Sequence, residues 1–299
     1  MISKKEKIGL IALIGKTNVG KSTLLNQFLL QKISITSRKP QTTRHRLLGI
    51  KTEGKSQMIF VDTPGFHKGQ NRALNQYMNK IAIGSINGVD IVLFIVEALK
   101  YKEEDKLLLE RIPESTKNVI LVINKVDKIS NKKDLLPFIQ VLAKKFNFCE
   151  IIPISALKKH NIKELEKAIS TRLSFGKHLY PEDKVTDISE RFLASEIIRE
   201  KCITRVGDEV PYRLTVFIDH FSKEKKITHI HATLYVEKTS QKGIIIGKQG
   251  QRLKAIGTAA RKDLESTLQK KIMLKLWVKV KKDWTNDQEA MIAMGYDHA

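Results

Sequence analysis

The sequence predicts an α/β fold with a mostly parallel sheet flanked by helices, followed by a smaller α+β unit. Short apolar runs alternate with amphipathic segments through the first part of the chain, as in parallel sheets with helices on both faces. The pattern changes near residues 174–184, a stretch with Gly176, Pro181 and few apolar side chains. We therefore expect one domain over residues 1–178 and a second over residues 179–299.

The first domain contains near-continuous apolar runs, which are typical of buried parallel strands. They cover residues 8–14, 58–61, 91–96, 119–123 and 151–154. Segments with apolar residues every three or four positions lie between these runs and predict helices. These segments cover residues 21–30, 71–83, 103–111, 132–146 and 162–173.

The second domain is predicted to follow the order α-β-β-α-α-β. A helix over 189–205 precedes two strands over 213–221 and 227–237, and a glycine-bearing segment leads into a helix that ends near Gln269. Alternating apolar residues predict a last strand over 272–281, at an edge or half-buried. Thr285 and Gln288 have the spacing of a capping box, and Gly295 can stop a short terminal helix.

The composition indicates a strongly basic protein. The 299 residues include 54 Lys and Arg against 32 Asp and Glu, a net charge of +22 that favours RNA, DNA or an anionic membrane face as partner. Cys149 and Cys202 are far apart, which excludes a disulfide framework and fits a reducing cytosol. The start lacks the full pattern of a signal peptide, and no apolar run reaches the roughly 18 residues of a membrane span. We expect a soluble, cytoplasmic protein that can still touch a membrane surface.

Residues 15–22, Gly-Lys-Thr-Asn-Val-Gly-Lys-Ser, match the pattern GxxxxGK[ST] between a predicted strand and a predicted helix. Glycines let backbone N–H groups surround phosphates, and the helix N-terminus adds a favourable dipole. Lys21 can place its charge on the β and γ phosphates, and Ser22 can offer a hydroxyl to Mg²⁺. The pattern predicts a nucleoside triphosphate site.

Two further segments supply what such a site needs around Mg²⁺ and the γ-phosphate. Residues 62–65, Asp-Thr-Pro-Gly, follow the strand over 58–61, where Asp62 can hold Mg²⁺ through water and the Gly65 N–H can meet the γ-phosphate. A threonine between the phosphate loop and Asp62 should also reach Mg²⁺. We favour Thr43 for this role, with Thr42 as the alternative.

Two segments at later strand ends predict that the base is guanine. Residues 124–127, Asn-Lys-Val-Asp, follow the strand over 119–123, and the Asp127 carboxylate can accept the N1–H and N2–H₂ donors that adenine lacks as a pair. Lys125 can lie along the base, and Asn124 can tie the loops together. Ser155 and Ala156 follow the strand over 151–154 and can supply a backbone N–H to guanine O6. Ligands of α/β sheets bind at these carboxyl ends, so the segments in order predict GTP.

Hydrolysis is predicted to depend on position and charge, with Lys21, Thr43 and Gly65 as catalytic residues. Phe66 follows Gly65, where Ras-like proteins carry glutamine, so slow intrinsic turnover is expected. Asn18 resembles an asparagine of potassium-selective GTPases, so K⁺ is a further expected cofactor; the alternative is that Asn18 only shapes the loop. The full set of predicted nucleotide-binding residues is Gly15, Asn18, Val19, Gly20, Lys21, Ser22, Thr23, Asp62, Gly65, Asn124, Lys125, Asp127, Ser155, Ala156 and Leu157. Mg²⁺ is assigned to Ser22, Thr43 and Asp62.

The second domain contains a glycine pattern beside basic residues. Between Lys238 and Lys262 there are seven basic residues and no acidic one, and GxxG lies inside this stretch. KH domains use such a loop to approach the backbone of single-stranded RNA, and the order α-β-β-α-α-β favours the type II KH topology. We expect Lys248 to neutralise phosphate and Ile245 and Ile246 to meet bases. The predicted RNA-binding residues are Ile245, Ile246, Gly247, Lys248, Gln249, Gly250, Arg252 and Lys254. The alternative is a glycine-rich helix junction on a solvated basic face.

Together these features resemble the Era family of bacterial GTPases over essentially the full chain. The resemblance rests on residues 33–38 (Ile-Ser-Ile-Thr-Ser-Arg), 41–46 (Gln-Thr-Thr-Arg-His-Arg), 191–200 (Arg-Phe-Leu-Ala-Ser-Glu-Ile-Ile-Arg-Glu) and 276–281 (Leu-Trp-Val-Lys-Val-Lys). Within the third segment, Glu196, Arg199 and Glu200 are candidates for interdomain or RNA-facing charges. One departure is Lys16-Thr17, where the family usually has Arg-Pro, and this should alter the stiffness of the loop.

The resemblance implies a P-loop GTPase domain followed by a type II KH domain. It further implies a monomeric GTP/GDP switch that binds the 3′ end of 16S rRNA and acts in 30S subunit assembly. It also implies a loose association with the inner membrane. Two other readings stay open. One is a GTPase of membrane-surface or cell-cycle signalling, and the other is an RNA-binding module with a vestigial GTP site.

Overall fold

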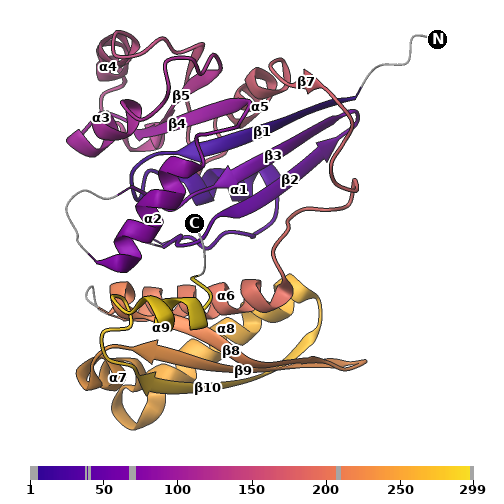
Figure 1. Cartoon of the computed structure of the whole chain (residues 1–299), viewed down its shortest axis with the longest axis vertical. Coiled ribbons are helices and arrows are strands. Elements are labelled where there is room, and N and C mark those ends of the chain that lie inside the picture. Colours follow the sequence, from indigo (N-terminus) through magenta and orange to yellow (C-terminus); the bar gives the residue numbers. More distant parts are fainter. Residues whose placement is uncertain (1–5, 38, 40–41, 67–71, 207–209, 297–299) are drawn as a thin grey trace. The chain divides into compact units, whose positions relative to one another are not determined.

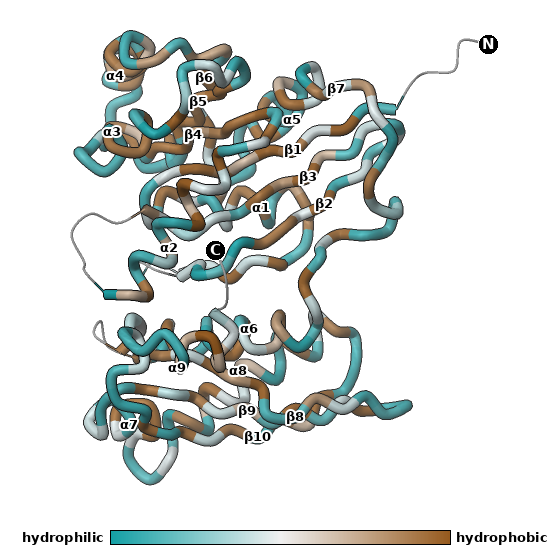
Figure 2. The backbone as a smooth tube through the Cα atoms, in the orientation of Figure 1, coloured by the Kyte–Doolittle hydropathy of each residue, from teal (hydrophilic) through white to brown (hydrophobic). Residues whose placement is uncertain are grey.

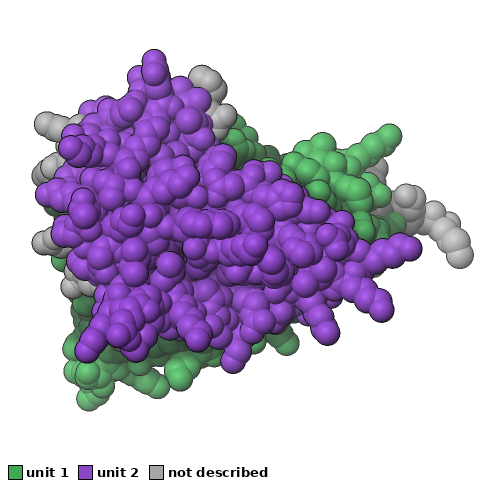
Figure 3. Space-filling view, turned by 90° about the horizontal axis from the view of Figure 1, so that it is seen from below, with its two compact units in different colours: residues 1–34, 43–70, 77–187 green, residues 35–42, 71–76, 188–299 purple. Residues whose placement is uncertain are grey.

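The computed structural model describes residues 6–37, 39, 42–66, 72–206 and 210–296. The chain divides into two compact units, coloured in Figure 3. Unit 1 comprises residues 1–34, 43–70 and 77–187, and unit 2 comprises residues 35–42, 71–76 and 188–299. Each unit has its own sheet and its own apolar core.

Unit 1 is built on one sheet with the strand order β2-β3-β1-β4-β5-β6, in which β7 also pairs with β1. Pairing is parallel except for β2 with β3 and β7 with β1. The predicted parallel strands are confirmed. The strands are β1 (Lys7–Ile14), β2 (Leu47–Glu53), β3 (Ser56–Asp62), β4 (Ile91–Glu97), β5 (Val119–Asn124), β6 (Glu150–Pro153) and β7 (Ser174–Phe175). The antiparallel strands β2 and β7 were not expected from the sequence.

The helices that belong to this sheet follow the predicted order (Figure 1). They are α1 (Lys21–Leu29), α2 (Ala73–Gly84), α3 (Glu103–Leu109), α4 (Leu135–Ala143) and α5 (Ile162–Ser170). The strands of this sheet are mostly apolar along their length, as their brown colour in Figure 2 shows, because both faces are covered. On one face Phe28 of α1 stacks on Phe60 of β3 with ring centroids 4.5 Å apart, and on the other Leu108 of α3 joins the core of β4 and β5.

Unit 2 has the order α-β-β-α-α-β that the sequence predicts. Its sheet runs β10-β9-β8, with β8 antiparallel and β10 parallel to β9, so β10 is an edge strand as expected. The helices α6 and α8 pack on one side of this sheet (Figure 1). The elements are α6 (Glu190–Arg205), β8 (Thr215–Lys223), β9 (Ile227–Val236), α7 (Thr239–Ile246), α8 (Gln251–Leu268), β10 (Lys271–Val280) and α9 (Gln288–Ala293).

The predicted capping box at the last helix is wrong. The helix α9 begins at Gln288, and its N-cap is Asp287, whose carboxylate accepts a hydrogen bond from Ala290 N at 3.0 Å. Thr285 is buried and donates its hydroxyl to the Glu237 carboxylate. A buried hydroxyl needs a hydrogen-bond partner, and here Glu237 provides it.

Candidate nucleotide site and nucleic-acid interface

The predicted nucleotide segments meet at one edge of the sheet in unit 1. The phosphate loop follows β1, Asp62 ends β3, Asn124 ends β5 and Ser155 comes shortly after β6. These strands are parallel, so their carboxyl ends lie on the same side. This edge is where α/β sheets bind ligands.

The phosphate loop requires glycine at position 20. Gly20 has φ of +105°, and a Cβ atom there would lie 2.3 Å from the amide nitrogen of Asn124. The same Asn124 amide donates to Val19 O at 2.7 Å, and its side-chain oxygen accepts from Ala156 N at 3.0 Å. Asn124 therefore connects the phosphate loop to the segment after β6.

Lys21 lies folded into the phosphate loop. Its ammonium group donates to Gly15 O at 2.8 Å and to Lys16 O at 2.9 Å, and the side chain is buried. Burial lowers the pKa of Lys21 to about 8, although the carboxylates of Asp62 and Asp105 oppose this effect. A buried cation without a direct carboxylate partner is costly, so an anion placed in this loop would be strongly favoured.

Three oxygen-bearing side chains converge beside Lys21. Ser22 Oγ lies 2.8 Å from Asp62 Oδ2 and 2.7 Å from Thr43 Oγ1. Asp62 is fully buried, and its Oδ1 has no hydrogen-bond partner within the described part of the chain. Burial raises the pKa of Asp62, while Lys21 and hydroxyl donors oppose that rise. Hard oxygen ligands around an unpartnered carboxylate oxygen fit Mg²⁺.

Ser34 is a member of this cluster that the sequence analysis did not assign. Its hydroxyl donates to Asp62 Oδ2 at 2.8 Å, and its backbone N–H and O both bond to the Asn26 side chain. The only sequence signal is a serine between Ile33 and Ile35, which are both buried. Ser34 thus fixes the orientation of the Asp62 carboxylate.

The two threonine candidates have different surroundings. Thr43 Oγ1 lies against Ser22, as described above. Thr42 donates its hydroxyl to Lys39 O at 2.7 Å. The geometry therefore favours Thr43 over Thr42 as the metal ligand.

Lys125 is held by a carboxylate that the motif search missed. Its ammonium group lies 2.6 Å from Glu97 Oε2 and 2.5 Å from Asn18 O, and its backbone has φ of +67°. Burial alone would raise the pKa of Glu97, but hydrogen bonds and charge from Lys100 and Lys125 lower it to about 2. Glu97 therefore stays ionised and orients Lys125 beside the phosphate loop.

Asp127 and the segment after β6 form the predicted base-recognition group. Asp127 is exposed, and its Oδ1 accepts from Ser155 Oγ at 2.5 Å. Ser155 and Ala156 are buried, whereas Leu157 is 67% exposed. The Ser155 hydroxyl donates a hydrogen bond to one carboxylate oxygen of Asp127. This bond fixes the orientation of the carboxylate group that would face a base.

Lys16, which departs from the family pattern, anchors the phosphate loop to α3. Its ammonium group forms an ion pair with the buried Asp105 and donates to Lys100 O at 3.1 Å. Gly65 approaches the loop so closely that a Cβ atom there would lie 2.5 Å from Thr17 Cγ2. Phe66 packs against the core of β4 and β5. Its phenyl ring has no group that could orient a water molecule by a hydrogen bond.

The glycine loop of unit 2 joins α7 to α8. Gly247 has φ of +71°, and a Cβ atom there would lie 2.7 Å from Arg252 Cβ, so only glycine fits without displacement. The Arg252 guanidinium donates back to Ile244 O at 2.5 Å. Lys248, Gln249, Arg252 and Lys254 are exposed around this turn.

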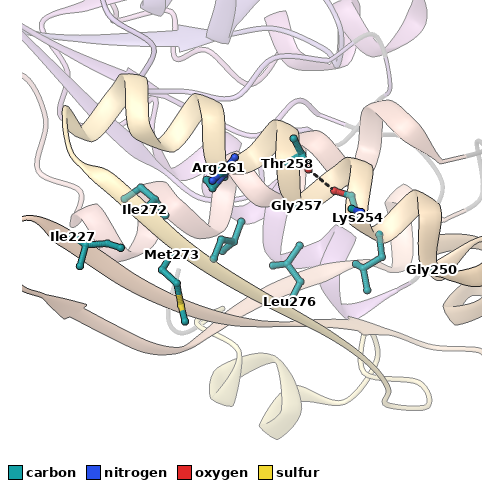
Figure 4. A pocket seen from close by; sticks show the side chains of 11 residues that line it. Ile227, Gly250, Lys254, Gly257, Thr258, Arg261, Ile272, Met273 and Leu276 are labelled. Carbon is teal, nitrogen blue, oxygen red and sulfur yellow. Dashed lines mark hydrogen bonds between the residues drawn. The ribbon is translucent and has the colours of Figure 1, made fainter.

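A groove of about 690 Å³ runs from this turn between α8 and β10 (Figure 4). Residues on one face of α8 and on β10 line it, with Thr258 bonded to Lys254 O at 2.9 Å. The sequence analysis missed most of these residues, although the α8 members recur every three or four positions. The lining is Ile227, Gly250, Leu253, Lys254, Gly257, Thr258, Arg261, Ile272, Met273, Leu274 and Leu276.

One expectation for unit 2 is wrong, and for a second only the RNA-facing alternative is excluded. Ile245 is 0% exposed and belongs to the core, so it cannot meet bases; Ile246 is half-buried and Ile244 is 39% exposed. Glu196, Arg199 and Glu200 are buried and do not face RNA. Arg199 instead pairs with Glu196 at 2.6 Å.

Fold and site together define a P-loop GTPase domain joined to a type II KH domain. A family model described as a 50S ribosome-binding GTPase matches residues 10–125, and one described as a KH domain matches residues 209–285. The GTPase Era of Pseudomonas fluorescens (strain Pf0-1) is 51% identical over 290 residues, which is 97% of both chains. That of Azotobacter vinelandii (strain DJ) is 49% identical, again over 97% of both.

Two solved structures of Era match the fold of this chain over both domains. One is Era in complex with MgGDPNP and nucleotides 1506–1542 of 16S ribosomal RNA, with a TM-score of 0.94 and 42% identity over 98% of this chain and 100% of that one. The other is an Aquifex aeolicus Era variant bound to GDP and AlF₄⁻, with the same TM-score, identity and coverage. The chain belongs to the Era family of GTPases.

Proposed function

We propose that this GTPase is a switch that binds the 3′ end of 16S rRNA through its KH domain and acts in assembly of the 30S subunit. The groove beside the GxxG turn carries this proposal, because its apolar lining suits bases and Lys254 and Arg261 suit phosphates. The exposed Lys248 and Arg252 add positive charge at the turn. The related Era structure with MgGDPNP and 16S rRNA supports the same ligands here.

In the nucleotide site, Lys21 would leave the carbonyls of Gly15 and Lys16 and bind the β and γ phosphates. Ser22, Thr43 and Asp62 would hold Mg²⁺, which would neutralise negative charge on the phosphates. The Gly65 N–H would orient the γ-phosphate, and Asp127 with Ala156 N would select guanine. Phe66 gives the attacking water no hydrogen bond, so intrinsic turnover should be slow.

A path from nucleotide to RNA-binding unit follows from contacts within unit 2. Residues 35–42 belong to that unit and run directly into Thr43. Thr36 N donates to Glu200 Oε1 at 3.0 Å, and Arg199 donates to Thr42 O, so α6 binds Thr36 and Thr42. Movement of Thr43 on loss of the γ-phosphate would pull on residues that α6 binds.

Potassium is expected to accelerate hydrolysis. Asn18 lies exposed at the tip of the phosphate loop with φ of +60°, and a K⁺ held by its side chain would supply positive charge at the phosphates. Phosphate release should be about tenfold faster in KCl than in NaCl at equal ionic strength. The Asn18→Ala variant should lose this difference, and equal rates of the unchanged protein in both salts would show the prediction to be wrong.

Gly247→Asp is expected to weaken binding of a single-stranded oligonucleotide of the 16S rRNA 3′ end by about tenfold or more. The new side chain collides with Arg252 and places a negative charge where the phosphate backbone should pass. Fluorescence anisotropy of the labelled RNA measures this. Gly84→Asp is the matched control, because a Cβ atom at the exposed Gly84 meets nothing within 4 Å.

GTP affinity should be the same in both glycine variants. If Gly247→Asp bound the RNA as tightly as the control variant, the groove would not be the RNA site and this proposed function would fail. Loss of GTP affinity in Gly247→Asp would instead mean that the substitution disturbs the whole chain.

Among the described helices, none is long and apolar enough to cross a membrane. A cytoplasmic location, loose contact with the inner membrane and a monomeric state accompany the proposal as predictions from the family resemblance.

A further inference from the structure

The sheet of unit 2 has a second face that α6 and α8 do not cover. One end of this face contacts the segment after α9, where Thr215 Oγ1 lies 3.1 Å from Tyr296 Oη. Alternate residues of β8, β9 and β10 point to the core under α6 and α8, among them Ile218, Ala232 and Val278. The residues between them point the other way. We call the following set the outer sheet face: Phe217, His220, His229, His231, Thr233, Lys275, Trp277 and Lys279.

Aromatic rings form a row across this face. The rings of His220 and His231 lie 5.1 Å apart, and His231 lies 5.6 Å from Trp277 in an edge-to-face arrangement. Trp277 is 45% exposed and Phe217 is 36% exposed. A large aromatic side chain half in water at the centre of a strand forgoes hydrophobic stabilisation, so a ligand that covers it would gain that free energy.

Positive charge borders the aromatic row. Lys275 and Lys279 flank Trp277 on β10, and both are exposed, with no ion pair to either among the described residues. Successive side chains on one face of a strand stand about 6.6 Å apart, so lysine and tryptophan alternate along a flat strip.

Two carboxylates lie near this face. Asp219 accepts a hydrogen bond from Thr233 at 2.8 Å, and Glu224 lies 3.3 Å from His229. Desolvation and the charge of Lys275 lower the pKa of His231, which favours the neutral form of this aromatic ring. The outer sheet face therefore combines stacking surfaces with the positive charges of Lys275 and Lys279.

We propose that the outer sheet face is a second binding surface for single-stranded RNA, in addition to the groove of the KH domain. Bases stack on Trp277 and the histidine pair, and Lys275 and Lys279 contact phosphates. An anionic lipid surface would also attract exposed aromatic rings and lysines, so lipid vesicles are one arm of the test below. Single-stranded RNA matches both the rings and the charge.

The outer sheet face and the groove share no residue, so they can be tested apart. Leu274 and Leu276 line the groove, while Lys275 and Trp277 point away from it. The Gly247→Asp substitution should weaken RNA binding in the groove of the full-length protein and leave the outer sheet face intact. All measurements can therefore be made in that background.

The experiment follows tryptophan fluorescence as a 12-nucleotide single-stranded oligoadenosine is added. The chain has two tryptophans, and Trp284 is fully buried, so it gives a constant background. We expect saturable quenching that disappears in Trp277→Phe and is much weaker with a duplex RNA of equal length. In an anisotropy titration, Trp277→Ala should lower affinity for the oligonucleotide about tenfold, as loss of one stacked base predicts.

Phe175→Ala is the matched control, since Phe175 is an exposed aromatic residue of unit 1 and its loss should leave RNA affinity unchanged. His231→Gln should lower affinity as well, without removing the tryptophan signal. Equal quenching by duplex and single strand would mean charge attraction alone and would overturn the proposal. So would a Trp277 signal that responds only to anionic lipid vesicles, or only to the concentration of the protein itself.

Discussion

Replacing Asp127 by Asn is expected to lower the affinity for GTP by about a hundredfold or more. The carboxylate would accept two hydrogen bonds from guanine, and bonds to a charged group contribute roughly 1.5–3 kcal/mol each. The neutral amide keeps one acceptor and presents an N–H₂ group to a donor of the base. Ser155 Oγ already occupies Oδ1 of Asp127, so the amide oxygen should remain at Ser155 and the amide nitrogen should face the base.

Titration of a fluorescent GTP analogue measures this effect, with the xanthosine triphosphate counterpart as the matched ligand. Xanthine carries an oxygen where guanine has its 2-amino group, so the Asp127→Asn protein should bind it better than the unchanged protein does. A variant that still preferred GTP over ATP to the original extent would refute the assignment of Asp127.

Lys21→Ala is expected to remove about a hundredfold or more of the affinity for GTP, and less of that for GDP. Lys21 provides the cation of the phosphate loop, and without it the γ-phosphate loses a charge-assisted hydrogen bond. The folded protein should tolerate the change, because burial of this ammonium group is itself unfavourable, as its lowered pKa shows. Thermal unfolding with and without Mg·GTP measures both effects.

Lys163→Ala is the control for this variant, since Lys163 is an exposed lysine of α5. It should keep the full rise in melting temperature on addition of Mg·GTP. A similar rise in Lys21→Ala would place the phosphates elsewhere than in this loop.

Much of unit 1 could be predicted because its signals are local. Buried parallel strands leave apolar runs in the sequence, and the nucleotide segments follow those runs directly. The strand β2 leaves a weaker signal, since it pairs antiparallel at the edge of the sheet and ends in the polar residues Lys51, Thr52 and Glu53. Its existence depends on the register with β3, which no short stretch of sequence contains. β7, with two residues, has no periodicity to detect.

The supporting residues of the site could not be predicted for a related reason. Ser34 and Glu97 match no motif, and their roles arise from contacts with Asp62 and Lys125 that are distant in the chain. The run Ile244–Ile246 shows the same limit in unit 2. Three consecutive isoleucines carry no periodicity, so only the packing of α7 decides that Ile245 is buried and Ile244 is exposed.

If the protein is a switch, the bound nucleotide controls its affinity for RNA, and one titration tests this directly. A labelled single-stranded oligonucleotide of the 16S rRNA 3′ end is titrated with the full-length protein, with Mg²⁺ and a non-hydrolysable GTP analogue, with GDP, or without nucleotide. We predict the tightest binding with the GTP analogue and clearly weaker binding with GDP. Equal affinity in all three states would contradict the switch, and absence of binding in every state would contradict the RNA-binding function itself.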